Sequence, residues 1–278
     1  MNDQGADLRM RRESVARELP EGTSACVVGS GKGGVGKSLL AGLLAAALAR
    51  RGQRTLLVDG AQNQGNQHVL FGVRPVAPLE SLILGERTAR ELVVPVAPDL
   101  DLMPADSGAE MLYGLGPIDR ARLHQRVSGL WDDYDQVVVD GGPGLESVVR
   151  AAAIRADRLV VLTTPDPTAL SDAYALLKIV HLQVPSIQIG VMVNRVSADE
   201  EGQLVFDRLQ LAATRFLGRD LDDLGCVPES EMLRSAARRP GSMLEIESAG
   251  IETWAERLMP TEVGMSGLEG DPTRGLPA

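Results

Sequence analysis

The chain has 278 residues, of which 44% are hydrophobic and only 3% aromatic, and its 28 Lys and Arg against 38 Asp and Glu leave a net charge of −10. This length is enough for one large domain, and a core of Ala, Leu and Val suits parallel strands packed between helices. The acidic balance argues against a broadly cationic surface, so we expect no direct nucleic-acid partner. A local basic patch of Arg234, Arg238 and Arg239 is the exception that stays open.

The cysteines and the apolar runs favour a cytoplasmic protein. Cys26 and Cys226 lie in predicted strands without the spacing of a metal site, and we expect buried thiols. No run approaches the length of a membrane span, and the charged N-terminus lacks the apolar segment of a signal peptide. The predicted helix at Ile246–Met259 has an acidic polar face, which favours packing on the core and predicts weak or no membrane binding.

The two ends of the chain differ in composition from its middle. Residues 1–22 are polar and charged and close with Pro20-Glu21-Gly22, which predicts a flexible arm that is either a short amphipathic helix or disordered. Residues 260–278 contain three prolines and several glycines and are predicted to be a disordered tail. The folded domain is therefore expected at residues 23–259.

The first motif of the domain is a glycine-rich loop between a short apolar strand, Ala25–Val28, and a long apolar helix, Leu39–Ala49. This order predicts a P-loop, in which glycines let backbone N–H groups and a helix N-terminus face one anion. Lysine and serine at its end would contact the β- and γ-phosphates and Mg²⁺, so ATP or ADP with Mg²⁺ is the expected cofactor. The nucleotide-binding residues assigned here are Gly31, Lys32, Gly33, Gly34, Val35, Gly36, Lys37 and Ser38.

Two further predicted strands end in a carboxylate. Leu56–Asp59 follows the P-loop helix, and Tyr134–Asp140 leads directly into a glycine-rich turn. A carboxylate at the carboxyl end of such a strand can hold water bound to Mg²⁺, so Asp59 and Asp140 join Ser38 as predicted metal-site residues. The simpler alternative for a strand-terminal aspartate is a helix cap.

The remaining elements complete a mainly parallel α/β sheet with helices on both faces. Residues 69–98 carry several prolines and are expected to form short helices and loops, and the turn after Thr163 is expected to end in a threonine cap. Strands are predicted at Leu100–Met103, Leu159–Thr163, Ile187–Arg195 and Leu224–Val227, and helices at Ile118–Leu130, Ala198–Leu217 and Ile246–Met259.

The extra lysine of the loop, Lys32, makes it resemble the deviant P-loop of the MinD/ParA group of ATPases. That resemblance implies an ATP-bound homodimer, in which Lys32 reaches the phosphates of the partner and acts with Lys37 in catalysis. It also implies that Asn194 and the adjacent Arg195 lie at the adenine. Pro228 and Glu229 would bring backbone to the same base.

Within this group the chain resembles the FlhG family, also called FleN or YlxH. The resemblance is carried by the string from Thr163 to Lys178 and by Asp3-Gln4-Gly5-Ala6-Asp7-Leu8-Arg9. It implies a switch that regulates flagellar number, flagellar placement and flagellar gene expression. The implied partners are an FlhF-like GTPase, contacted through Asp3, Gln4, Leu8 and Arg9, and a FleQ-like transcription activator. Partners of this kind could recruit the protein to the cell pole or membrane.

The sequence departs from the MinD group at switch I. Asp59 and Asn66 fit that pattern, but Ala61 occupies the place of the aspartate that positions the attacking water. Loss of such a group costs about 10²- to 10⁴-fold in rate, so slow hydrolysis is expected. A neighbouring amide, Gln62, Asn63 or Gln64, could orient water instead. The alternatives are an ATP-binding scaffold without hydrolysis and a ParA- or MinD-type partitioning or cell-division ATPase.

Overall fold

The computed structural model describes residues 23–60, 65–78, 80–105, 125–127, 129–142, 144–145, 148 and 156–258. These residues form one eight-stranded sheet, in the order β3-β4-β2-β5-β1-β6-β7-β8. Its strands are β1 (Ser24–Gly29), β2 (Thr55–Asp59), β3 (Val94–Ala97), β4 (Leu100–Met103), β5 (Gln136–Asp140), β6 (Arg158–Thr163), β7 (Gln188–Val196) and β8 (Asp222–Pro228). The predicted mainly parallel sheet is confirmed.

One edge strand was not predicted. β3 pairs antiparallel with β4, whereas every other strand pair in the sheet is parallel. Residues 94–97 lie in the stretch expected to hold only short helices and loops, because Pro95 argues against a strand. A proline is tolerated here because an edge strand has no neighbour on its outer side to receive the missing N–H.

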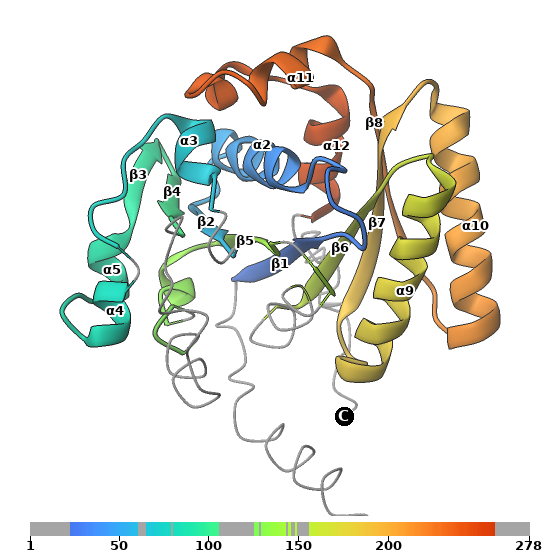
Figure 1. Ribbon diagram of the computed structural model, residues 1–278, viewed down its shortest axis with the longest axis horizontal. Helices are drawn as coiled ribbons and strands as arrows, with labels where there is room; N and C mark the ends of the chain where they lie inside the picture. The colour runs from blue at the N-terminus through green and yellow to red at the C-terminus, as the bar shows by residue number, and fades with distance from the viewer. Residues whose placement is uncertain are drawn as a thin grey trace, which may run out of the picture.

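Helices cover both faces of the sheet, as predicted (Figure 1). Successive side chains of a strand point to opposite faces, so Val27 joins one core and Cys26 and Val28 join the other. The helices are α2 (Lys37–Arg50), α3 (Gln67–Phe71), α4 (Glu80–Leu84), α5 (Ala89–Leu92), α9 (Pro167–Gln183), α10 (Asp199–Leu217), α11 (Glu231–Ala236) and α12 (Ala249–Leu258), with 3₁₀ turns η1 (Trp131–Asp133) and η2 (Ser242–Glu245).

The P-loop helix α2 lies in the middle of one layer. Every residue from Leu40 to Ala49 is buried, which explains why the helix is apolar on all sides. It packs against strands and against α12, whose side chain of Trp254 is fully buried. Arg51, the C-cap residue of α2, also forms ion pairs with Glu252 and Glu256 of α12. The apolar face of α12 therefore serves the core, as its acidic polar face led us to expect.

Helices α9 and α10 cover the opposite face. α9 begins at Pro167, and the Asp166 carboxylate caps it by accepting the backbone N–H of Thr168 at 2.8 Å. The prediction of a threonine cap is therefore wrong. Asp166 directly precedes Pro167, the first residue of the helix, and so occupies the cap position. Among the helices of the described residues, none combines the length and the apolar composition that crossing a bilayer requires.

Some expectations fall outside the described residues. They concern the arm at 1–22, Ala61 and the amides at 62–64, most of the helix expected at Ile118–Leu130, and the tail at 260–278. Within the described part of the chain, the other predicted strands and long helices are found with ends that shift by a few residues.

The packing of α12 yields a stability prediction. Trp254→Ala should lower the free energy of unfolding by about 3–5 kcal/mol, because a buried aromatic side chain is lost and a cavity is left. Leu211→Ala on α10 is the matched control, since that side chain is 68% exposed and its loss should change stability little. Denaturant unfolding followed by circular dichroism measures both. Equal stability of the two variants would show that α12 does not pack as described.

Candidate functional site

The P-loop lies at the carboxyl end of β1 and leads into α2. Its first glycine touches α9, since a Cβ at Gly31 would lie 2.0 Å from the backbone oxygen of Asp172. The last one, Gly36, has φ of 100° and forms the N-cap of α2, a left-handed conformation that favours glycine. The backbone N–H groups at the start of α2 thus have no side-chain cap and remain available to an anion.

Two carboxylates lie side by side next to this loop. Asp59 and Asp140 are partners in the register of β2 and β5, with exposed fractions of 6% and 0%. Burial lowers the pKa of the Lys37 ammonium, and the negative charge of Asp140 partly opposes that shift. A buried pair of carboxylates beside a lysine is typical of a site that binds a cation.

These residues fit Mg²⁺. The Oδ1 atom of Asp140 is buried and has no hydrogen-bond partner, so it can accept from water on a metal ion. Within the described residues no group of three or more His, Cys, Asp or Glu is placed to hold a metal by itself. A donor set of one hydroxyl, Ser38, with Asp59 and Asp140 would suit an ion that keeps several waters and shares phosphate oxygens.

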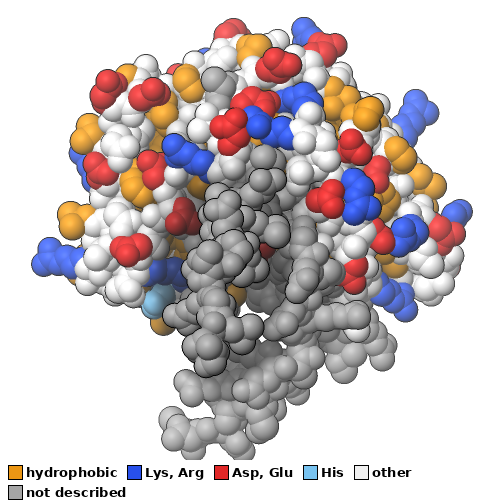
Figure 2. All heavy atoms as spheres, turned by 180° about the vertical axis from the view of Figure 1, so that it is seen from behind, with side chains coloured by type: hydrophobic (Ala, Val, Ile, Leu, Met, Phe, Trp, Pro, Cys, Tyr) orange, Lys and Arg blue, Asp and Glu red, His pale blue; other side chains and the backbone are white. Residues whose placement is uncertain are grey.

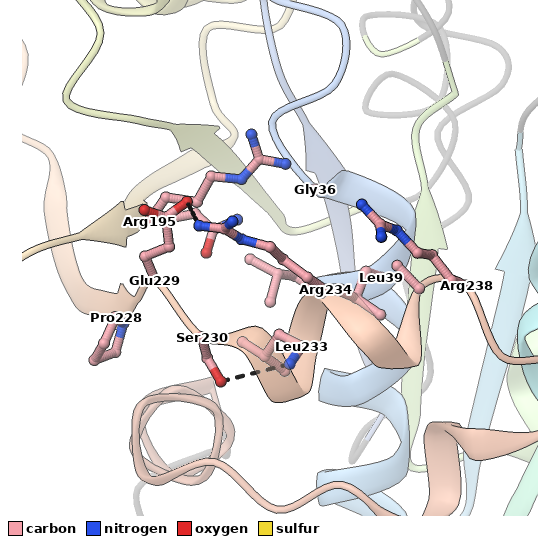
Figure 3. A pocket seen from close by; sticks show the side chains of 12 residues that line it. Gly36, Leu39, Arg195, Pro228, Glu229, Ser230, Leu233, Arg234 and Arg238 are labelled. Atoms are coloured by element: carbon pink, nitrogen blue, oxygen red, sulfur yellow. Dashed lines mark hydrogen bonds and ion pairs between the residues drawn. The ribbon is translucent and has the colours of Figure 1, made fainter.

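A pocket of about 450 Å³ opens beside Gly36 (Figure 3). All four residues expected at the nucleoside line it, namely Asn194, Arg195, Pro228 and Glu229. The buried Asn194 donates its Nδ2 to the Val35 backbone oxygen at 2.8 Å, so its amide oxygen is left as an acceptor. The structure thus joins the C-terminal ends of β7 and β8 to the P-loop in one cavity.

The backbone of β7 is irregular where it enters this pocket. The register with β8 shifts between Asn194 and Val196, and Arg195 has φ of 61°. Arg234 of α11 and Arg238, just after the helix, also line the pocket, and Arg234 pairs with Glu229 at 2.5 Å. The basic patch left open by the sequence is therefore partly neutralised, since the remaining member, Arg239, also has an acidic partner in Glu245 at 3.4 Å.

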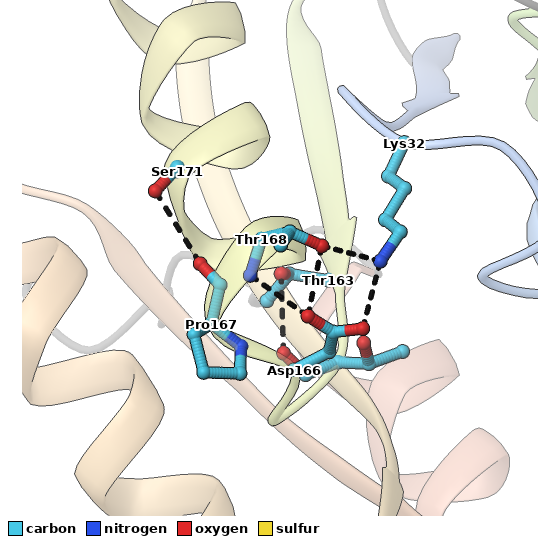
Figure 4. Close-up of polar contacts among 7 residues, drawn as sticks. Lys32, Thr163, Asp166, Pro167, Thr168 and Ser171 are labelled. Atoms are coloured by element: carbon cyan, nitrogen blue, oxygen red, sulfur yellow. Dashed lines mark hydrogen bonds and ion pairs between the residues drawn. The ribbon is translucent and has the colours of Figure 1, made fainter.

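Lys32, the extra lysine of the P-loop, forms its contacts within the same subunit. Lys32 Nζ lies 2.7 Å from Asp166 Oδ2 and 2.5 Å from Thr168 Oγ1, so side chains at the N-terminus of α9 bind this lysine (Figure 4). These contacts hold the pKa of the Asp166 carboxyl below its usual range, through the hydrogen bond from Lys32 and then those from Thr168. Both side chains of this ion pair are partly exposed, at 34% and 47%, so the contact can open into solvent.

Charges of both signs are mixed over the face shown in Figure 2, where blue and red side chains alternate among the described residues. This pattern resembles an ordinary solvated surface and differs from the stripe of like charge that favours nucleic acid.

Sequence reasoning missed three polar groups of the site. Asp166 and Thr168 hold Lys32, and the Gln67 side chain lies between the P-loop helix and Asp140. The one available signal for Asp166 was its position before an N1 proline, which is typical of a cap. Gln67 follows Asn66, but a single glutamine after a loop gives no indication of burial.

Known proteins are similar to this chain in sequence. The profile of a family described as "AAA domain" matches residues 24–189. The chain is 31% identical to the antiactivator FleN of Pseudomonas aeruginosa over 78% of each chain. It is also 31% identical to the flagellum site-determining protein YlxH of Helicobacter pylori, over 78% of this chain and 73% of the relative.

A solved structure shares the fold. The septum site-determining protein MinD of Pyrococcus horikoshii, complexed with Mg-ADP, aligns with a TM-score of 0.69 and 22% identity, over 85% of this chain and 96% of that one. Together, the family profile and the identity over most of the length show that the chain belongs to the FleN/YlxH (FlhG) family of MinD/ParA-type P-loop ATPases.

Proposed function

We propose that this chain is an ATP-dependent dimerising switch that regulates flagellar number or placement and flagellar gene expression. The observation that carries the nucleotide part is the continuous site from Lys32 through the P-loop to the pocket beside Gly36. The flagellar part rests on two relatives, the antiactivator FleN and the flagellum site-determining protein YlxH, and on the resemblance of the sequence to the FlhG family.

The roles of the residues follow from their positions. The loop backbone from Gly31 to Gly36, together with Lys37, would hold the phosphates, and the pocket with Asn194 would hold adenosine. Ser38, Asp59 and Asp140 would hold Mg²⁺, which when bound neutralises phosphate charge. Arg195, Pro228 and Glu229 would close the pocket around the base.

Lys32 gives the switch its two states. Its contacts with Asp166 and Thr168 and a contact with the phosphates of a second subunit exclude each other, because one ammonium group cannot occupy both places. Dimer formation around ATP would therefore release the N-terminus of α9. A change at that helix offers partners a surface that depends on the bound nucleotide.

The proposed partners are an FlhF-like GTPase, reached through Asp3, Gln4, Leu8 and Arg9 of the arm, and a FleQ-like transcription activator. These arm residues precede the proposed ATPase domain at 23–259, and a tail at 260–278 follows it. Recruitment to the cell pole would go through such partners. Hydrolysis would be slow, because Ala61 cannot accept a hydrogen bond from water.

The nucleotide site predicts a loss of binding in Lys37→Ala. ATP affinity in the presence of Mg²⁺ should fall at least about 100-fold, because charge-assisted hydrogen bonds to phosphate contribute about 1.5–3 kcal/mol each. Isothermal titration calorimetry measures the affinity. Lys178→Ala, which removes an exposed lysine of α9, is the matched control and should bind like wild type. Unchanged affinity in Lys37→Ala would overturn the site.

Switch I predicts a gain of activity. Ala61→Asp should raise the single-turnover rate of ATP hydrolysis by about 10²- to 10⁴-fold, since it restores an acceptor for the attacking water. Quenched-flow measurement of ADP formation checks this. A wild-type rate that the substitution does not improve would mean that another group, such as Gln62, Asn63 or Gln64, positions the water. Complete absence of wild-type turnover would favour the ATP-binding scaffold.

A further inference from the structure

Gln67, the first residue of α3, contacts three of the groups around the proposed Mg²⁺ position. Its side chain is fully buried. The Nε2 atom donates to the Ser38 backbone oxygen at 2.8 Å and to Asp140 Oδ2 at 3.1 Å, while the backbone N–H donates to Asp59 Oδ2 at 3.1 Å. One residue therefore contacts the first turn of α2 and both strand-terminal carboxylates.

Packing does not explain a glutamine at this position. Its Oε1 atom has no hydrogen-bond partner. A Cβ placed on Gly42 would lie 3.0 Å from Oε1, 2.7 Å from Met243 Cε and 3.1 Å from Phe71 Cε2, so the space around this oxygen is lined by apolar groups. An aliphatic side chain of similar length would fill the space around Oε1 without burying an unpaired amide oxygen, but it would leave Asp140 Oδ2 without the Nε2 donor. What the glutamine adds is its donor.

The direction of the amide follows from its neighbours. Both groups facing Nε2, a backbone carbonyl and a carboxylate, are acceptors, so only the NH₂ end of the amide can face them. Its bond to Oδ2 fixes the rotation of the Asp140 carboxylate. Oδ1 of the same carboxylate is buried and left without a hydrogen-bond partner.

We propose that Gln67 is a positioning residue for Mg²⁺: it orients the Asp140 carboxylate, so that Oδ1 is presented to the water on the metal, and it ties α3 to Asp59 and Asp140. This inference rests on the proposed nucleotide site. Groups that orient metal ligands typically change metal affinity 10- to 100-fold when they are removed.

The test is a titration of Mg²⁺ into the full-length, ADP-loaded protein, with the binding affinity measured by isothermal titration calorimetry. In Gln67→Leu, the Mg²⁺ affinity should fall about 10- to 100-fold. ADP affinity measured in EDTA should change less than about twofold, because the leucine leaves the P-loop and the pocket intact. The melting temperature without Mg²⁺ should fall, because the buried Oδ2 of Asp140 and the Ser38 backbone oxygen lose the Nε2 donor.

Gln136→Leu is the matched control. Gln136 is another buried glutamine and begins β5, the strand that ends in Asp140. Its replacement should leave the Mg²⁺ affinity unchanged. Where Gln67→Leu does not fold, Gln67→Met, an unbranched side chain of similar length, provides the same comparison.

Two results would overturn the inference. A Mg²⁺ affinity within about twofold of wild type would show that Gln67 does not act on the metal, and a loss of ADP binding in EDTA as large as the loss of Mg²⁺ affinity would show a structural role only. Wild-type protein that binds no ADP in either condition would instead overturn the proposed function, and the role of Gln67 with it.

Discussion

The site depends on two buried carboxylates that stand side by side. The register of β2 and β5 pairs Asp59 with Asp140, and neither side chain has more than 6% of its surface exposed. Two adjacent anions removed from water repel each other and lose hydration, so the fold has to supply donors or positive charge. Gln67 supplies donors to both, and the partly buried Lys37 ammonium supplies charge. Oδ1 of Asp140 has no hydrogen-bond partner, and the proposed Mg²⁺ with its waters would bind there.

Lys32, unlike the two carboxylates, is not deeply buried. It lies in a partly exposed place and is held by Asp166 and Thr168 at the start of α9. Exposed ion pairs are weak, so this contact can be exchanged for another at little cost. The molecule thus combines a rigid base, built on the parallel strands and α2, with a lysine that can change partners. That combination suits a switch better than an enzyme of high turnover.

Much of this architecture could be predicted from the sequence, because it depends on local patterns. The P-loop and the carboxylates Asp59 and Asp140 lie at the ends of apolar runs that are readable as strands, whereas the roles of the four pocket residues were implied by the family resemblance. The edge strand around Pro95 was missed, because a proline is a poor strand signal unless the edge position is known. The Lys32–Asp166 and Gln67–Asp140 contacts join residues far apart in sequence, and a single chain carries no signal for them. Ala61 lies outside the described residues, so its effect on hydrolysis stays a prediction.

The most direct test of the switch is the mass of the nucleotide-bound protein. Size-exclusion light scattering with Mg²⁺ and a non-hydrolysable ATP analogue should show a dimer for wild type and for Lys178→Ala. Lys32→Ala should bind the analogue but stay monomeric, because the contact across the interface is lost. A wild-type protein that stays monomeric with nucleotide bound, or a Lys32→Ala variant that dimerises equally well, would contradict the account.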